Sequence, residues 1–593
     1  MIGSMFVGQK LMWTSANVSF LLSVVALGVM ATPPRSKFKA AVYGHAVILP
    51  ENPTTVVSRD EALINMKKNI DVYRSQAAVA KLQGADILVF PEDGLYGFTF
   101  TRESIYPYLE TIPDPRLETW SPCSDPHRHS DTDILRALSC IAKHSSLYLV
   151  ANMGDKQPCD ASTEPKCPKD GRYQFNTNVA FGPDGTLLAR YHKFHLFFEP
   201  QFDTPDLELV HFDTPFGRFG MLVCFDVLFK EPGVPMVTEN NISNIVFPTA
   251  WMDALPLLSA LGFHSSFARG LGVNFLSADI HLPGSRFHGS GIYSPNGAEA
   301  FYYGAKNTSL PKLLVAELDV LDTPKHEVDI LDLMSAKGQR RHEPSARYHE
   351  NMLSHGESMR GKGNEDKVWA VNKDANEEFT SLLFYDQFTF VALNEPAGTL
   401  KVCQKEVCCK LEYAIEERDY KKELFAFGAF DGLHTYEGQY YFQICTVVKC
   451  DSAFDRSTCG AETTTSSTHF LKLKMSAHLG TPFVYPQIVL SDHRGELHLA
   501  EPGAWTFTES VLRTSPSFNG TLLSAALFGR DYGRDDGTTK EGDDVDEDSS
   551  RDVNVIGETT GERNDSAKVS YIISIVTSLF GLVHAGLSVL FGV

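Results

Sequence analysis

The sequence is short of positive charge. Its 593 residues hold 53 Lys and Arg against 74 Asp and Glu, which gives a formal net charge of -21 at pH 7. Binding to a phosphate backbone needs a concentrated basic surface, so this balance excludes nucleic acid as the main partner. Hydrophobic residues make up 43% of the chain, which excludes global disorder. A chain of this length predicts two folded domains with processed or flexible ends.

The spacings that commonly hold catalytic metal ions are also missing. The chain contains neither an HExxH motif nor paired CxxC motifs. A metal hydrolase remains an alternative, and the histidines it would draw on are His127, His129, His192, His195 and His264. Neighbouring histidines in a basic loop usually lie at the surface, so we expect no metal site.

Both ends of the chain carry apolar segments with few flanking charges. The run Val18–Met30 follows Lys10, is shorter than a usual membrane span and ends in small residues, which predicts a signal peptide over 1–31. Residues 569–593 are apolar, and no Lys or Arg follows them. A retained single-pass helix normally has a basic flank, so we expect a signal for a GPI membrane anchor, with a retained helix or peripheral segment as the alternative.

Cysteine usage agrees with export. Four of the 11 cysteines lie between 123 and 167, six lie between 403 and 459, and Cys224 stands alone. An odd number leaves at least one thiol unpaired, and we expect this to be Cys224, while the other ten can form five bridges of open connectivity. In a secreted chain four sequons would accept glycans, at Asn241, Asn307, Asn519 and Asn564.

Short apolar runs alternate with helical or loop segments between residues 39 and 325. Ser58–Lys81 has the apolar spacing of an amphipathic helix, and hairpins are predicted at 178–190 and 291–303. The runs typical of buried strands are 40–43, 86–90, 147–151 and 244–247. Strands alternating with helices, together with hairpins, predict an α/β layered domain with a mixed sheet.

A change of composition separates this region from the rest. Residues 326–374 are charged and of lower complexity, which predicts a linker region. Beyond them 375–530 has strand composition and holds the second cysteine group, so we predict a smaller β-rich domain stapled by disulfides. The acidic stretch 531–568 predicts a disordered linker.

Three segments of the first region place a reactive residue beside a strand end. They are Glu92 in FPEDG, Lys193 in RYHK and Cys224 in LVCFD. Together they could attack a carbonyl carbon: the thiolate is the nucleophile, the carboxylate relays protons and the ammonium stabilises the oxyanion. Singly, each has an ordinary explanation as a capping carboxylate, a surface lysine or a buried inert thiol.

The three segments together resemble the Glu, Lys, Cys triad of the nitrilase (carbon-nitrogen hydrolase) superfamily, in that family's order. Three longer segments narrow the resemblance to the biotinidase and vanin (pantetheinase) branch. These are CPKDGRYQFNTNVAF at 167–181, FPTAWMDALPLL at 247–258 and FGAFDGLHTYEGQYYFQIC at 427–445. The resemblance runs from about residue 39 to about residue 530 and so spans both domains.

This resemblance implies a fold and a mechanism. The fold is a four-layer αββα sandwich for 39–325, with a β-rich C-terminal domain. In the mechanism Cys224 is the nucleophile that forms a thioester, Glu92 the general base and acid, and Lys193 the stabiliser of the oxyanion, completed by the backbone N–H of Phe225. Glu199 resembles the second glutamate that many family members use to orient the triad. No metal or organic cofactor is implied.

The branch implies a small-molecule amide as substrate, of one of two kinds. FPEDGLYGFTFTR and DPHRHSDT are closer to biotinidase, which releases biotin from biocytin and biotinyl peptides. VNFLSADIH, VCQKEVCCK and the GPI-like tail are closer to vanins, which cleave pantetheine to pantothenate and cysteamine. The segments near the active-site loops favour biotinidase. A non-enzymatic GPI-anchored scaffold is a further alternative, although all three triad positions hold the required residue types, and the oligomeric state is open.

Overall fold

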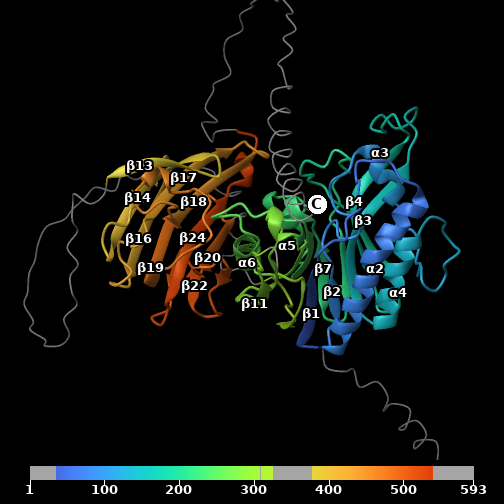
Figure 1. The fold of residues 1–593 in the computed structure, drawn as a ribbon, viewed down its shortest axis with the longest axis horizontal. Coiled ribbons are helices and arrows are strands. Elements are labelled where there is room, and N and C mark those ends of the chain that lie inside the picture. Colours follow the sequence, from blue (N-terminus) through green and yellow to red (C-terminus); the bar gives the residue numbers. More distant parts are fainter. Residues whose placement is uncertain (1–34, 307–308, 325–376, 538–593) are drawn as a thin grey trace, which may run out of the picture. The chain divides into compact units, whose positions relative to one another are not determined.

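The computed structural model describes residues 35–306, 309–324 and 377–537 (Figure 1). The expected signal peptide, the whole of the expected linker 326–374 and the apolar tail lie outside the described residues. Asn307 and Asn564 lie outside them as well. The described chain continues past the expected boundary at 530 to residue 537, through the short 3-10 helix η5 (Tyr532–Arg534). Asp535 takes part in this extension because it accepts hydrogen bonds from Arg530.

The first sheet lies between helices and a second sheet. Its six strands run in the order β12-β1-β2-β3-β4-β5, with β1, β2 and β3 parallel and the other neighbours antiparallel. The strands are β1 (Lys37–Gly44), β2 (Ile87–Val89), β3 (Tyr148–Pro158), β4 (Arg172–Phe181), β5 (Leu187–His192) and β12 (Lys312–Asp319). Both predicted hairpins form, the first as β4 and β5.

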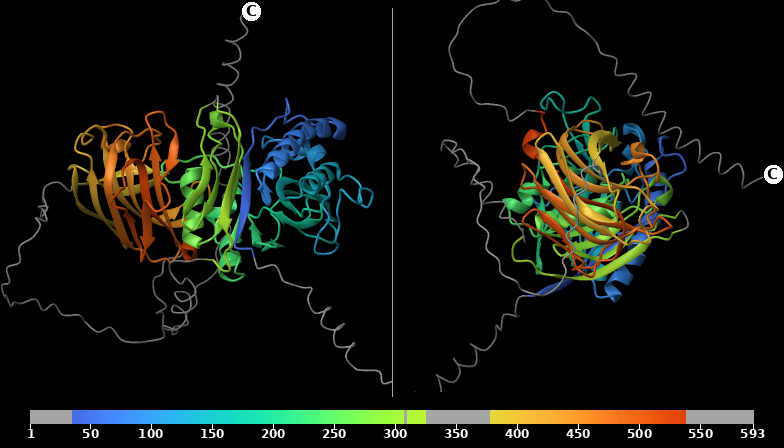
Figure 2. Two further views of the ribbon diagram at one scale, coloured as in Figure 1. Left: turned by 90° about the horizontal axis from the view of Figure 1, so that it is seen from below. Right: turned by 90° about the vertical axis from the view of Figure 1, so that its left-hand side faces the viewer.

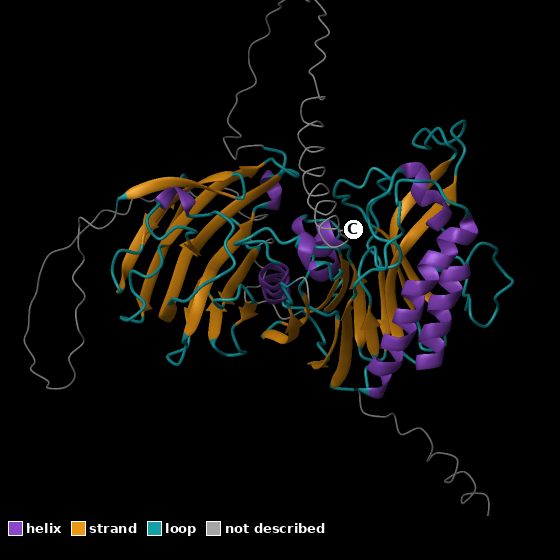
Figure 3. Cartoon of the chain, viewed as in Figure 1, coloured by secondary structure: helices purple, strands orange, loops and turns teal. Residues whose placement is uncertain are grey.

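Helices α2 (Arg59–Leu82) and α4 (Asp133–Ser145) cover one face of this sheet (Figure 3). The Ser58 side chain caps α2 by accepting the N–H of Glu61, and the first turn carries the acidic residues that suit a helix N-terminus. Its apolar stripe repeats every three or four positions, at Ala62, Met66, Ile70, Tyr73, Ala77 and Ala80. The predicted helix at Ser58–Lys81 is confirmed.

The second sheet packs on the opposite face of the first. Its order is β11-β10-β9-β8-β7-β6, with β7, β8 and β9 parallel. The strands are β6 (His211–Thr214), β7 (Gly217–Met221), β8 (Asn244–Thr249), β9 (Asn274–Asp279), β10 (Ser290–Ser294) and β11 (Gly297–Tyr302). Successive side chains of a strand point to opposite faces, so Ala41 and Leu88 meet the helices while Val42 and Val89 meet the second sheet.

Helices α5 (Gly233–Thr238) and α6 (Ala260–Leu271) belong to the core on the side of the second sheet. The order of helices, sheet, sheet and helices is the four-layer αββα sandwich that the resemblance implies. Four short elements complete this region: α3 (Arg102–Ile105) and the 3-10 helices η1 (Tyr106–Tyr108), η2 (Cys224–Leu228) and η3 (Pro283–Ser285).

The region after residue 377 consists almost wholly of strands (Figure 2). Its main hydrogen-bonded path is β13-β14-β17-β18-β24-β19-β16-β15, around its own apolar core. The strands are β13 (Glu378–Leu383), β14 (Asp386–Ala392), β15 (Ala397–Gln404), β16 (Val407–Ile415), β17 (Phe425–His434), β18 (Tyr440–Lys449), β19 (His469–His478), β20 (Val484–Ser491), β21 (Leu497–Leu499), β22 (Trp505–Thr508), β23 (Val511–Thr514) and β24 (Gly520–Arg530). The short 3-10 helix η4 (Arg456–Thr458) precedes β19.

Disulfides confirm the grouping of the cysteines. Two bridges form within the first group, Cys123–Cys140 and Cys159–Cys167. The second group forms Cys403–Cys408, Cys409–Cys445 and Cys450–Cys459. Cys224 is the remaining thiol, as expected.

The lengths of the described helices and the exposure of two asparagines bear on the expected membrane anchor and glycans. Among the described helices, none is both long and apolar enough to span a bilayer. Asn241 and Asn519 are exposed, as a glycan acceptor must be, and glycosylation there remains a prediction.

Candidate active site

The sandwich brings together the three reactive residues predicted from the sequence. Glu92 follows β2 and Lys193 follows β5 in the first sheet, while Cys224 follows β7 in the second sheet and begins the 3-10 helix η2 (Cys224–Leu228). Their exposed fractions are 1%, 2% and 7%. A buried lysine or glutamate is rare unless it is paired, so this burial calls for partners.

Lys193 lies between two glutamates. Its Nζ is 2.8 Å from Oε1 of Glu92, a residue 101 positions earlier, and it also donates to Oε1 of Glu199. An ammonium has three N–H donors, and these two contacts leave one for another acceptor. Glu199 also accepts the N–H of Phe197. The structure therefore places Glu199 in direct contact with the lysine.

One residue of the loop after β8 contacts both Glu92 and Cys224. The N–H of Ala250 donates to Oε2 of Glu92 at 2.8 Å, and the carbonyl of Ala250 accepts the Cys224 thiol at 3.6 Å. Cys224 has a φ of 43°, in the left-handed region that a non-glycine residue rarely adopts. Such strain persists only where the surroundings over-determine it, and it is common at functional sites.

The electrostatics of the cluster are dominated by burial. Desolvation raises the pKa of the Cys224 thiol well above its ordinary value, the charge of Glu92 raises it further, and Lys193 opposes this. Desolvation by itself lowers the pKa of Lys193, but the charges of Glu199, Glu92 and Cys224 outweigh it, so the net pKa is raised. The lysine therefore stays an ammonium, and the thiol needs a base to become a nucleophile.

Asp226 holds the turn that carries the nucleophile, and reasoning from the sequence missed it. Its carboxyl accepts the N–H groups of Val223 and His195 and the hydroxyl of Tyr191. Burial raises its pKa to about 7. The turn also includes Phe225, whose N–H belongs to the first residues of η2; the first N–H groups of a helix have no acceptor within the helix.

Buried asparagines behind the glutamates were also missed. Asn176 of β4 donates to Glu92 and Glu199 at 2.8 and 2.9 Å. It belongs to the segment CPKDGRYQFNTNVAF that carries the resemblance, but nothing in its spacing along the chain shows which carboxylates it meets.

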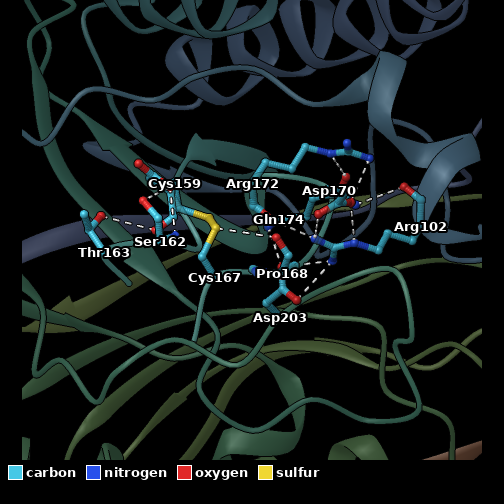
Figure 4. Close-up of a disulfide and its surroundings, with 11 residues drawn as sticks. Arg102, Cys159, Ser162, Thr163, Cys167, Pro168, Asp170, Arg172, Gln174 and Asp203 are labelled. Carbon is cyan, nitrogen blue, oxygen red and sulfur yellow. Dashed lines mark hydrogen bonds and ion pairs between the residues drawn. A yellow bond between two sulfur atoms is a disulfide. The ribbon is translucent and has the colours of Figure 1, made fainter. Parts of the chain in front are cut away.

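A network of charges lies beside the segment that carries Glu199. Arg102 binds Asp170 and Asp203, next to the Cys159–Cys167 disulfide (Figure 4). Asp203 accepts the N–H of Gln174, and the Gln174 amide donates to the carbonyl of Gln201 at 2.8 Å. These bonds attach residues 201–203 to β4, the strand that also bears Asn176.

Four of the five histidines considered for a metal ion have other neighbours. His192 contacts Asp155, His195 contacts the carbonyl of Glu231, and His264 contacts Ser277. His129 contacts Glu118. Across the described ranges the one group with suitable ligand atoms is Glu416, Asp419 and His469, in the C-terminal region, where Lys422 and Arg418 already pair with the two carboxylates.

Comparison with known proteins agrees with the geometry. Residues 39–254 match the carbon-nitrogen hydrolase family, and residues 378–535 match the Vanin C-terminal domain. The chain is 44% identical to a pantetheinase of Bos taurus over 501 residues, covering 84% of this chain and 90% of that protein. It is 44% identical to a pantetheinase of Homo sapiens, with the same coverages, and 41% identical to a biotinidase of Homo sapiens, again over 84% of this chain and 90% of that protein. The chain therefore belongs to the vanin and biotinidase branch of the nitrilase superfamily, the carbon-nitrogen hydrolases, and is a hydrolase of amide carbon–nitrogen bonds.

Proposed function

We propose that the chain hydrolyses a small-molecule amide through a thioester on Cys224, with Glu92 as the general base and acid. The observation that carries this proposal is the pair of contacts made by Ala250. Its N–H holds the Glu92 carboxylate and its carbonyl holds the Cys224 thiol, so a base and a nucleophile share one peptide segment in a buried site.

In the first half of the reaction the thiol proton of Cys224 passes to Glu92, and the sulfur bonds to the amide carbonyl carbon. The third N–H of Lys193 and the N–H of Phe225 stabilise the oxyanion that forms. The carbon–nitrogen bond then breaks, and the leaving amine takes the proton from Glu92. A thioester between the acyl group and Cys224 remains.

In the second half a water molecule gives a proton to Glu92 while its oxygen attacks the thioester carbonyl. The carbon–sulfur bond breaks, the acid leaves, and the sulfur recovers the proton from Glu92. Glu199 keeps Lys193 in place through both halves, because it accepts a hydrogen bond from the same ammonium that binds Glu92.

We propose pantetheine as the substrate, with biotinyl amides as the second candidate. Support for pantetheine comes from the segments VNFLSADIH and VCQKEVCCK and from pantetheinases at 44% identity, although a human pantetheine hydrolase and the human biotinidase are both 41% identical. Support for biotinyl amides comes from the segments FPEDGLYGFTFTR and DPHRHSDT. The five disulfides support work outside the cell, in an oxidising compartment, and the apolar tail supports a GPI anchor.

The decisive experiment compares hydrolysis of pantetheine and biocytin by the purified protein, with Cys224→Ala as the blank. A kcat/KM for pantetheine well above that for biocytin supports the first candidate. The reverse ratio supports the second. Cleavage of neither compound at rates above the blank contradicts both substrate assignments.

A further inference from the structure

Three buried asparagines form a hydrogen-bonded chain behind the candidate active site. They are Asn152 of β3 and Asn176 and Asn178 of β4, with exposed fractions of 1%, 1% and 0%. Asn152 and Asn178 are direct partners across the two antiparallel strands, and Asn176 lies two residues before Asn178. Residues two apart along a strand point to the same face, so all three amides share one face of the first sheet.

The chain of hydrogen bonds has one direction. The N–H of Asp93 donates to Oδ1 of Asn152 at 3.0 Å. The amide nitrogen of Asn152 then donates to Oδ1 of Asn176 at 2.6 Å and to Oδ1 of Asn178 at 3.1 Å. Because a backbone N–H can only donate, it forces the oxygen of Asn152 toward Asp93 and the nitrogen toward the other two amides.

The hydrogen bonds at the other end of this asparagine network impose the same direction. The nitrogen of Asn176 donates to Oε1 of Glu92 at 2.8 Å and to Oε2 of Glu199 at 2.9 Å. The nitrogen of Asn178 donates to the carbonyl of Leu222, two residues before the nucleophile, at 3.0 Å. Carboxylates and carbonyls only accept from these donors, so both ends require the same orientation of every amide.

We propose that Asn152 and Asn176 act as a relay of fixed polarity that presents two N–H donors to Glu92 and Glu199 and so holds both carboxylates in place around Lys193. Asn176 is a positioning residue that acts through the glutamates, and Asn152 acts through Asn176. This inference rests on the proposed function, because it assigns Glu92 the role of the base.

The charge of the site explains why neutral donors are needed there. Two glutamates face one ammonium, so Lys193 alone leaves an excess of negative charge. The titratable groups that face the two glutamates are Lys193, Cys224, Asp93, Tyr96 and Asp279. Donated hydrogen bonds favour an ionised carboxylate without adding a further charge to a buried site.

The relay is tested by the pH dependence of catalysis rather than by activity alone. In Asn176→Ala both glutamates lose a donor, so kcat/KM should decrease at least about 100-fold. The midpoint of the acidic limb of its pH profile should rise by about 1 unit. Loss of packing alone lowers the rate without moving this pH.

The decisive variant is Asn152→Asp, which touches neither glutamate. The new carboxylate can still accept the Asp93 N–H, but it cannot donate to Asn176, so the Asn176 amide is expected to turn and point its oxygen at the glutamates. The acidic limb should rise by about 0.5 to 1 pH unit. The matched control is Asn178→Asp, which adds the same charge beside Asn152 but leaves an oxygen for Asn152 to bind, so its shift should be clearly smaller.

Alkylation of Cys224 by iodoacetamide provides a second readout over the same pH range, since the other ten cysteines are in disulfides. The acidic limb of the alkylation rate should shift most in Asn176→Ala and Asn152→Asp and least in Asn178→Asp. Equal shifts in Asn152→Asp and Asn178→Asp, or an unmoved limb in Asn176→Ala, overturn the relay. If the wild type is alkylated but cleaves neither pantetheine nor biocytin, the proposed function fails. The pH dependence of the alkylation rate then still tests the relay. Should Asn152→Asp be recovered unfolded by circular dichroism, Asn152→Ala takes its place; it removes the donor to Asn176 without touching either glutamate, and the acidic limb should again rise.

Discussion

Two buried cations of this molecule are paired in different ways. Arg530, at the end of β24, is fully buried and donates to both oxygens of Asp535 and to the carbonyls of Leu228 and Tyr441. Lys193 is almost as buried, yet it faces two glutamates and the Cys224 thiol and keeps one N–H for a further acceptor. A cation paired with one carboxylate stabilises structure, whereas a cation between two carboxylates and a thiol can respond to charge that forms during a reaction.

The largest loss of activity is expected when the nucleophile beside Lys193 is removed. Cys224→Ala should abolish hydrolysis, because no thioester can form, while circular dichroism and thermal unfolding should show a folded protein. Activity that survives in this variant, after contamination is excluded with a separately purified batch, contradicts the assignment of Cys224.

Lys193→Ala should lower kcat by about 10² to 10³, the usual effect of losing one oxyanion donor. Steady-state kinetics measure this loss. Lys230→Ala is a suitable control because that side chain is 39% exposed, and it should change kcat little. A loss of only twofold in Lys193→Ala would place the lysine outside the reaction.

Arg530→Met tests the cation that is paired with one carboxylate. The change removes the counter-charge of Asp535 and the side-chain donor to the carbonyl of Leu228, so the unfolding free energy should fall by about 3 kcal/mol, as for other broken buried pairs. Urea unfolding measures the effect, and the pH profile of kcat/KM should keep its shape. The control is Arg513→Met on the exposed side of β23, where a change within about 0.5 kcal/mol is expected. If the two variants unfold at the same urea concentration, Arg530 is not a structural anchor.

Asp226→Asn tests how a buried carboxyl group near the nucleophile makes the stability of the fold depend on pH. Burial raises the pKa of Asp226 from 3.8 to about 7, so between these values the folded state holds a proton that the unfolded state has lost. This contribution stabilises the fold at pH 5 and is lost as the pH rises through 7. The unfolding free energy of the wild type minus that of the variant should therefore be larger at pH 5 than at pH 8, by on the order of 2 kcal/mol. Urea midpoints at the two pH values measure it, and a difference that stays constant or grows toward pH 8 contradicts the raised pKa.

Local patterns predicted much of the fold. The stripe of α2, the buried strands and both hairpins follow from residue spacing. The β-rich region 375–530 was predicted only in outline. Within it, residues 397–415 and 425–449 each form two antiparallel strands joined by a turn, β15 with β16 and β17 with β18. The turn between β15 and β16 places Lys405 at a φ of 48°, and no Asn-Gly or similar pair marks it in the sequence.

The sequence by itself predicted Glu92, Lys193 and Cys224 as the reactive residues, because each follows an apolar strand and the three segments together resemble the nitrilase triad, and it predicted that Cys224 would be the cysteine left unpaired. Only the tertiary structure decided what surrounds them. Asn152, Asn176, Asp226 and Ala250 reach the site from different strands and loops, and their hydrogen bonds depend on the packing of one sheet against the other. Spacing along the chain carries no record of such contacts, since they join residues whose separation in sequence is unrelated to their separation in space.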